Sequence, residues 1–255
     1  MGYKITPNYF ALKYWDSALD DNIRLHSISY DRCNFRCGFC NFSNRHSEEY
    51  VEYSYVEFRK KVLELRDKGR FFKFTGGEPT LNRLLIRDLR IVKKESCFVF
   101  LDSNGSKPEI IRQIADEGLI DVLGVSMKGI SRDEAAKTAG VLNTKYSWDN
   151  VLKTIQIAND YHIKTIVTMV FHNDINVENI ELFADILEKF ADIHLKINNL
   201  LETEYQGDFE YKKLDEDILK DYLKRFVERR PMWRGKITLV NSNDATTNSD
   251  AVIFL

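Results

Sequence analysis

Short apolar segments alternate with amphipathic segments along most of this 255-residue chain. The apolar segments run for five to eight residues and are rich in Val, Ile and Phe, which favours β-strands. The segments between them have the spacing of apolar residues that is typical of surface helices. The predicted strands cover 23–30, 71–75, 97–102, 121–126, 164–171, 193–197 and 236–240, and the predicted helices cover 55–68, 83–94, 108–117, 147–162, 177–190 and 215–229.

Repeated strand–helix units need right-handed crossovers and a mostly parallel sheet. Six or seven such units predict an α/β fold, specifically a partial (β/α)6 barrel of the TIM type rather than a short open sheet. No internal repeat or linker interrupts the pattern, so we expect one domain over 1–255. Its core would cover about 23–240, with an N-terminal extension at 1–22 and a polar C-terminal tail at 241–255.

The composition limits the possible partners. Hydrophobic residues make up 44% of the chain and aromatic residues 12%, which is enough for a sizeable core. The formal net charge of −2 predicts no strong attraction to nucleic acid or acidic lipid. No apolar run approaches the roughly 18–20 residues of a membrane span, and the N-terminus lacks the apolar core of a signal peptide. These features predict a cytoplasmic protein without membrane association, and we expect a monomer.

Three of the four cysteines lie within eight residues, directly after the first predicted strand. Cys33, Cys37 and Cys40 have the spacing C-x3-C-x2-C, and Gly38 between them allows a close approach of the loop. Three thiolates this close can bind three irons of a cubane cluster and leave the fourth iron open to a small molecule.

Two other interpretations of the cysteines remain open. A Cys3His zinc site could form if His46 or His26 supplied a fourth ligand, because thiolates suit zinc as well as iron. The cysteines could also be ordinary thiols. The fourth cysteine, Cys97, lies in an apolar segment and is expected to be a buried core thiol.

A second motif, Gly76-Gly77-Glu78-Pro79, follows the second predicted strand. The two glycines allow backbone amides to approach a ligand without an intervening Cβ, and Glu78 adds a carboxylate. Such a combination suits an ammonium group. The alternative is a simple Gly-Gly-x-Pro turn.

Polar residues also follow the other predicted strands. In a parallel barrel these positions meet at one edge, where active sites form. Lys128 is expected to be an active-site group, whereas His172 is more often an ordinary loop residue than a catalyst. The short side chains of Ser103 and Asn104 suit an Asx or Ser/Thr turn as well as a ligand. The candidates are Ser103, Asn104, Ser126, Lys128, Thr168, His172 and Asn198.

The cysteine motif, with Phe39 just before its last cysteine, and the Gly-Gly-Glu-Pro segment together resemble the radical S-adenosylmethionine (SAM) superfamily. The resemblance implies a [4Fe–4S] cluster on Cys33, Cys37 and Cys40 that chelates the amino and carboxylate groups of SAM. It implies reductive cleavage of SAM to a 5′-deoxyadenosyl radical, with an electron donor such as flavodoxin or ferredoxin. The residues it assigns to SAM are Phe39 beside the adenine, Gly76, Gly77, Glu78 and Pro79 at the amino group, Ser103 and Asn104 at the carboxylate or ribose, and Ser126, Thr168 and Asn198.

Within that superfamily, the chain looks most like the pyruvate formate-lyase-activating enzymes, which abstract hydrogen from a glycine of a partner protein. It departs from them at 20–24, at Ser126 in place of an aspartate and at Thr168 in place of an arginine. The cysteine loop also looks like that of viperin-type enzymes, which modify nucleotides. The substrate class therefore stays open among protein, peptide and small molecule. With one cysteine left over, the chain cannot build a second cysteine-ligated cluster, and the tract 241–250 is expected either to close over the barrel mouth or to be a tail.

Overall fold

The computed structural model describes residues 2–11, 24–40, 50–172, 179–200, 211–241 and 252–254. In these ranges nine strands form one sheet in the order in which they occur along the chain. The strands are β1 (Tyr3–Ala11), β2 (Arg24–Tyr30), β3 (Phe71–Gly76), β4 (Phe98–Ser103), β5 (Val122–Ser126), β6 (Lys164–Phe171), β7 (Ile193–Asn199), β8 (Ile237–Val240) and β9 (Val252–Phe254).

The sheet is a partial barrel. Strands β2 to β8 pair in parallel, each with the next along the chain, which confirms the predicted α/β architecture. The outermost strands β1 and β9 run antiparallel to their neighbours β2 and β8. They end the strand order at opposite sides, so the sheet is not closed.

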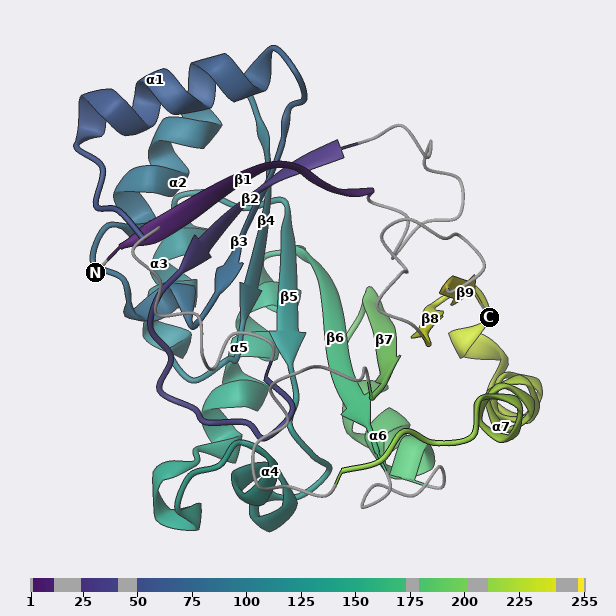
Figure 1. Cartoon of the computed structure of the whole chain (residues 1–255). Coiled ribbons are helices and arrows are strands. Elements are labelled where there is room, and N and C mark those ends of the chain that lie inside the picture. The colour runs from purple at the N-terminus through teal and green to yellow at the C-terminus, as the bar shows by residue number, and fades with distance from the viewer. Residues whose placement is uncertain are drawn as a thin grey trace.

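Helices connect the parallel strands and cover one face of the curved sheet, as Figure 1 shows for α1, α2, α3 and α5 beside β2 to β5. The first of them starts at a complete capping box, in which Ser54 and Glu57 satisfy each other's backbone amides. The helices are α1 (Tyr55–Arg66), α2 (Leu85–Lys94), α3 (Pro108–Asp116), α4 (Arg132–Thr138), α5 (Trp148–Asp160), α6 (Asn179–Leu187) and α7 (Glu216–Arg229).

The two faces of each parallel strand carry different side chains. In β3, Phe72 and Phe74 are buried, whereas the alternate residues Lys73 and Thr75 are only partly buried and line a cavity. The period of two in a strand produces this division, because successive side chains point to opposite faces. The outer face therefore belongs to the core, and the inner face is available for a site.

A small apolar cluster forms on the inner face, separate from the main core. Phe100, Val122 and Ile166 pack there with Leu25, and Phe71 and Phe98 contact them. Phe100 and Ile166 also belong to the cavity lining, so this cluster borders the cavity.

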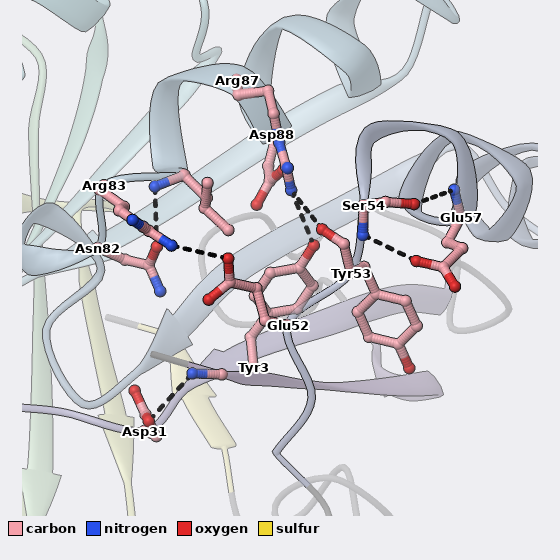
Figure 2. A network of polar contacts seen from close by, with 12 residues as sticks. Tyr3, Asp31, Glu52, Tyr53, Ser54, Glu57, Asn82, Arg83, Arg87 and Asp88 are labelled. Atoms are coloured by element: carbon pink, nitrogen blue, oxygen red, sulfur yellow. Dashed lines mark hydrogen bonds and ion pairs between the residues drawn. The ribbon is translucent and has the colours of Figure 1, made fainter.

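The chain ends add strands that the sequence pattern did not predict. Residues 3–11, predicted as part of an extension, form the edge strand β1, and residues 252–254 of the tail form β9. Tyr3 anchors β1: it is fully buried and its ring lies 5.5 Å from those of Tyr30 and Phe58. Figure 2 shows it beside Arg87 of α2. The segment 20–23 and the tract 242–250 lie outside the described residues.

Within the described ranges, no helix is both long enough and apolar enough to cross a membrane.

Candidate active site

A cavity of about 240 Å³ opens at the carboxyl ends of β3 to β7. The loop that follows β2 and carries the three clustered cysteines forms one side of it. The described lining residues are Cys33, Phe35, Cys37, Cys40, Lys73, Thr75, Gly76, Gly77, Glu78, Phe100, Asp102, Ser103, Asn104, Ser126, Lys128, Ile166, Thr168, Lys196 and Asn198.

Most of the residues predicted from the sequence thus meet around one cavity. The lining includes all three cysteines, the Gly-Gly-Glu stretch, and the polar residues predicted at the ends of β4, β5 and β7. It also includes Thr168 of β6 and Lys128 after β5. Phe39, Pro79 and His172 are not part of it.

The cysteine loop is held against the segment after α4. Phe35 is buried and stacks on Tyr146 with ring centroids 5.5 Å apart. The backbone amide of Arg36 donates to the carbonyl of Ala139 at 2.8 Å. These contacts fix the middle of the loop, so the flanking cysteines stay at the cavity.

The sulfur atoms lie in a largely desolvated environment with a few donors. The backbone amide of Phe35 donates to Cys33 Sγ at 3.3 Å, and Asn104 Nδ2 lies 3.8 Å from the same atom. Burial raises the pKa of the Cys37 thiol to about 11 and also raises that of Cys33. Without metal these thiols keep their protons, and metal binding has to displace them. Donors to sulfur raise the reduction potential of a cluster bound there.

Of the two histidines considered as zinc ligands, the one that the structure describes, His26, does not join this loop. His26 lies at the amino end of β2, where Nε2 is 3.1 Å from the carbonyl oxygen of Gly69 and the ring packs on Phe72. His46 lies outside the described residues. Among the described side chains, no three of His, Cys, Asp and Glu stand close enough to share one metal ion. The three thiolates that hold a cubane cluster can lie further apart than the ligands of a single metal ion, because each thiolate binds a different iron.

Glu78 connects the Gly-Gly turn to the end of β4. Its carboxylate is 1% exposed and accepts hydrogen bonds from Thr80 Oγ1 at 2.6 Å, Ser103 Oγ at 2.8 Å and the backbone amide of Asn104 at 2.6 Å. Burial raises the pKa of Glu78, and these donors oppose that rise. The sequence suggested a carboxylate aimed at an ammonium group. In the structure the carboxylate organises the residues around the cavity edge and also lines the cavity.

We expect Glu78→Gln to lower the free energy of unfolding of the metal-free protein by about 1–3 kcal/mol, because the amide nitrogen would face donors it cannot accept from. Chemical denaturation measures this. Glu64→Gln on the exposed face of α1 is the matched control and should have little effect. Unchanged stability in Glu78→Gln would contradict this role.

Ser103 and Asn104 form the turns that the sequence offered as an alternative. Ser103 Oγ accepts from the amide of Gly105 at 3.0 Å, and Asn104 Oδ1 accepts from the amide of Ser106 at 3.0 Å. Asn104 also donates to Asn34 Oδ1 of the cysteine loop at 2.8 Å. The two side chains also line the cavity, and the turns hold them in their orientation there.

Two of the three predicted residues outside the cavity lining, Phe39 and His172, belong to an aromatic group. The ring of Phe39 lies 6.2 Å from those of His172 and Tyr211, and His172 lies 4.1 Å from Tyr211. His172 and Tyr211 line a different hollow beside α4. Lys128 Nζ is 5.7 Å from the centre of the Phe39 ring. Pro79 is buried as the first residue of a short 3₁₀ turn.

A charged group on the inner face of the sheet was not predicted from the sequence. Lys73 Nζ of β3 lies 2.7 Å from Asp102 Oδ2 of β4, and Thr75 Oγ1 donates to the same oxygen at 3.3 Å. Lys196 of β7 lines the same cavity. Burial lowers the pKa of Lys196 to about 8, with repulsion by Lys73 as the next cause. The signal that could have identified these residues is a polar residue at every second position of an otherwise apolar strand.

Comparison with known proteins agrees with this site. Residues 27–187 match the radical SAM superfamily. A Methanocaldococcus jannaschii protein named as a glycyl-radical enzyme activating enzyme is 26% identical over 207 residues, which are 80% of this chain and 76% of that protein. A Thermoplasma volcanium protein named as a GTP 3′,8-cyclase is 28% identical, over 71% of this chain and 54% of that protein.

Solved structures share the fold. Streptococcus suis SuiB bound to S-adenosylmethionine superposes with a TM-score of 0.65 at 19% identity, covering 83% of this chain. A radical SAM methyltransferase from Sphaerobacter thermophilus gives a TM-score of 0.67 at 14% identity, covering 89% of this chain and 70% of that one. The chain spans about half the length of SuiB, 48% of it. With the family match over residues 27–187, the chain belongs to the radical SAM superfamily, whose enzymes use a [4Fe–4S] cluster to cleave S-adenosylmethionine.

Proposed function

We propose that this protein abstracts hydrogen from a substrate held inside the partial barrel, with Cys33, Cys37 and Cys40 as the cluster ligands. When bound, the cluster and SAM supply the electron and the carbon radical for that abstraction. The single observation that carries the proposal is the meeting of three soft thiols and the Gly-Gly-Glu turn around one cavity at the carboxyl ends of the strands.

The residues present suit both groups. Thiolates are the ligands that iron–sulfur clusters require, and Phe35 and Asn104 place donors near the sulfur of Cys33. Gly77 brings backbone to the cavity without a side chain. We assign Gly76, Gly77, Ser103 and Asn104 to the amino acid part of SAM.

The remaining lining residues would orient the nucleoside and exclude water. Ser126, Thr168 and Asn198 offer a hydroxyl or amide on three neighbouring strands, each able to donate or accept. Thr168 carries no charge, so a carboxylate near it would be hydrogen-bonded rather than ion-paired. Lys128 also lines the cavity and lies over the ring of Phe39. Excluding water strengthens each of these polar contacts and protects a radical from quenching.

Relatives of this chain are named for different substrates. One is named as an activating enzyme for a glycyl-radical enzyme, and several as GTP 3′,8-cyclases. We infer that the activase-like role and a small-molecule role share the same hydrogen abstraction. We also propose a flavodoxin or ferredoxin as the electron donor.

The test compares two cysteine variants purified without oxygen. The wild type should be brown, contain iron and sulfide, and release 5′-deoxyadenosine from SAM when dithionite is added. Cys37→Ser should lose most of the iron and lower 5′-deoxyadenosine release by at least about 100-fold, because a thiolate ligand is missing. Cys97→Ser is the matched control and should keep both, since Cys97 is buried in the main core just before β4, 3% exposed, and does not line the cavity.

A colourless wild type with stoichiometric zinc would overturn the proposal. So would a Cys37→Ser protein that keeps the iron content and the 5′-deoxyadenosine release of the wild type.

A further inference from the structure

We propose that the outward side of the cysteine loop is the docking face for the protein that supplies the electron, an acidic one-electron carrier. The inference rests on the proposed function, since it gives the flavodoxin or ferredoxin named there a place to bind. The basic residues of this docking face are Arg32 and Arg36, with Lys107 on the neighbouring loop. None of the three is among the described residues that line the cavity assigned to the cluster and SAM.

The cysteine loop has two sides, because alternate residues point in opposite directions. Over 32–37, the odd-numbered residues line the cavity, whereas the even-numbered residues Arg32, Asn34 and Arg36 are exposed. An extended segment shows this period of two. The exposed row therefore lies directly behind the cluster ligands, on the side that faces solvent. A carrier that docks there reaches the cluster without entering the cavity.

Arg36 brings a positive charge against the backbone of the cysteine loop. Its Nη1 donates to the carbonyl of Cys33 at 2.8 Å and to the carbonyl of Phe35 at 2.9 Å. These two hydrogen bonds hold the guanidinium beside a cluster ligand while the side chain stays exposed. A side chain held in this way loses less conformational freedom when a partner binds.

Neither arginine forms an ion pair with a carboxylate of the described residues. The nearest carboxylate along the chain, that of Asp31, accepts instead from the amide of Gly2 at 3.1 Å. Arginines elsewhere are paired, as Arg90 is with Glu117 at 2.6 Å. The docking face thus carries two uncompensated positive charges in a chain whose formal net charge is −2. A partner rich in carboxylates complements it.

The neighbouring loop extends the docking face. Asn34 Nδ2 donates to Ser106 Oγ at 3.0 Å, and Asn104 Nδ2 donates to Asn34 Oδ1 at 2.8 Å, so this loop lies against the cysteine loop. Lys107 follows Ser106 directly. Its Nζ lies 3.7 Å from Glu109, and both side chains are exposed, so this ion pair is weak. We expect Lys107 to contribute less to docking than the two arginines.

The small number of fixed charges suits an electron carrier. Electron-transfer complexes are weak and have small interfaces, because the partners must separate after each transfer. Charges near the point of transfer attract the carrier over a distance and raise the rate of encounter without a large apolar contact.

The test measures the association rate of oxidised flavodoxin, an acidic carrier, with the reconstituted enzyme by surface plasmon resonance without oxygen. A ferredoxin is the second probe. We expect one of them to bind the wild type with an association rate that falls steeply as salt is added. The double variant Arg32→Gln/Arg36→Gln should lower this rate at low salt by roughly 10-fold or more and should flatten its salt dependence.

Three comparisons isolate the charge of the docking face. Arg225→Gln removes an exposed arginine of α7 and should associate like the wild type. Arg32→Lys keeps the charge and should stay within about threefold of the wild type. In the double variant, 5′-deoxyadenosine release driven by reduced flavodoxin should fall by a similar factor relative to release driven by dithionite. Because both reductants use the same cluster, this ratio corrects for any change in the loop when the Arg36 hydrogen bonds are lost.

A double variant that associates as fast as the wild type, with the same salt dependence, would show that the carrier docks elsewhere. The inference is equally wrong if neither carrier binds the wild type. In both cases, dithionite-driven release of 5′-deoxyadenosine decides separately on the proposed function, which stands if SAM is cleaved and fails if it is not.

Discussion

Replacing Gly77 by alanine is expected to remove most of the iron from the purified protein and to abolish 5′-deoxyadenosine release. The backbone of the cysteine loop passes directly over this glycine. A Cβ on Gly77 would lie 2.0 Å from the carbonyl oxygen and 2.4 Å from the carbonyl carbon of Arg32. No atom at these distances is the end of a flexible side chain, so the loop itself must move.

The loop that would move is attached to the Gly-Gly turn by two hydrogen bonds. The amide of Gly77 donates to Tyr30 at 2.8 Å, and the amide of Glu78 donates to Arg32 at 2.5 Å. Cys33 follows immediately, so a shift of Arg32 displaces the first cysteine relative to the other two. We expect Gly77→Ala to cost about 3 kcal/mol of unfolding free energy or more, as overpacking against backbone does.

Gly118→Ala provides the matched control. Gly118 has a φ of +62°, which disfavours alanine, but no atom lies within 4 Å of the Cβ it would gain. Its cost should be about 1–2 kcal/mol from the backbone conformation alone, with full iron content. Iron and 5′-deoxyadenosine are measured in both variants. A Gly77→Ala protein with wild-type iron would show that the close contact is dispensable.

The parallel part of the sheet was predictable because each of its strands is a short segment rich in apolar and β-branched residues. The edge strand β1 was not, since it mixes polar and aromatic residues and depends on pairing with β2 further along the chain. The seven-residue helix α4 was missed because it is too short to show a helical period. Thus the central strands and the longer helices could be predicted from the pattern of their apolar residues, whereas the edge strand and the short helix could not.

In the candidate site, the spacing of the residues along the sequence identified the cysteines and the Gly-Gly-Glu turn. It did not show which side chains at the strand ends point into the cavity. Asn198 and Asn199 illustrate this: the first lines the cavity, whereas the second points away and bonds to the backbone of Leu214. Their positions in β7 differ by one, which reverses the face. Lys196 lies two positions before Asn198, so the alternation of side chains places both in the cavity. This alternation could have identified Lys196 from the sequence.

Replacing Arg87 by methionine is expected to destabilise the protein by about 3–5 kcal/mol at pH 8, because it leaves a buried carboxylate without its cation. Asp88 is 0% exposed, and its Oδ1 lies 2.8 Å from Arg87 Nε. Arg87 also donates to the carbonyl of Tyr53 at 3.1 Å and to the hydroxyl of Tyr3 at 3.4 Å. Figure 2 shows that these contacts join α2 to β1 and to the segment before α1.

The pH dependence of stability shows whether the buried charge of Asp88 causes the loss in Arg87→Met. Burial raises the pKa of Asp88 to about 7 even though Arg87 lowers it, whereas in the unfolded chain an aspartate titrates near 3.9. Between these values the folded protein binds the proton more tightly, so stability decreases as the pH rises from about 4 to about 7.

Without Arg87 the pKa of Asp88 rises further, the decrease extends to higher pH, and Arg87→Met should be less damaging at pH 6 than at pH 8. Adding Asp88→Asn removes the charge and should restore part of the loss at pH 8. Arg90→Met, on the same helix but in an exposed ion pair with Glu117, should have little effect at either pH. Urea denaturation at the two pH values measures all four proteins, and an equal loss in Arg87→Met at both would assign the effect to packing instead of charge.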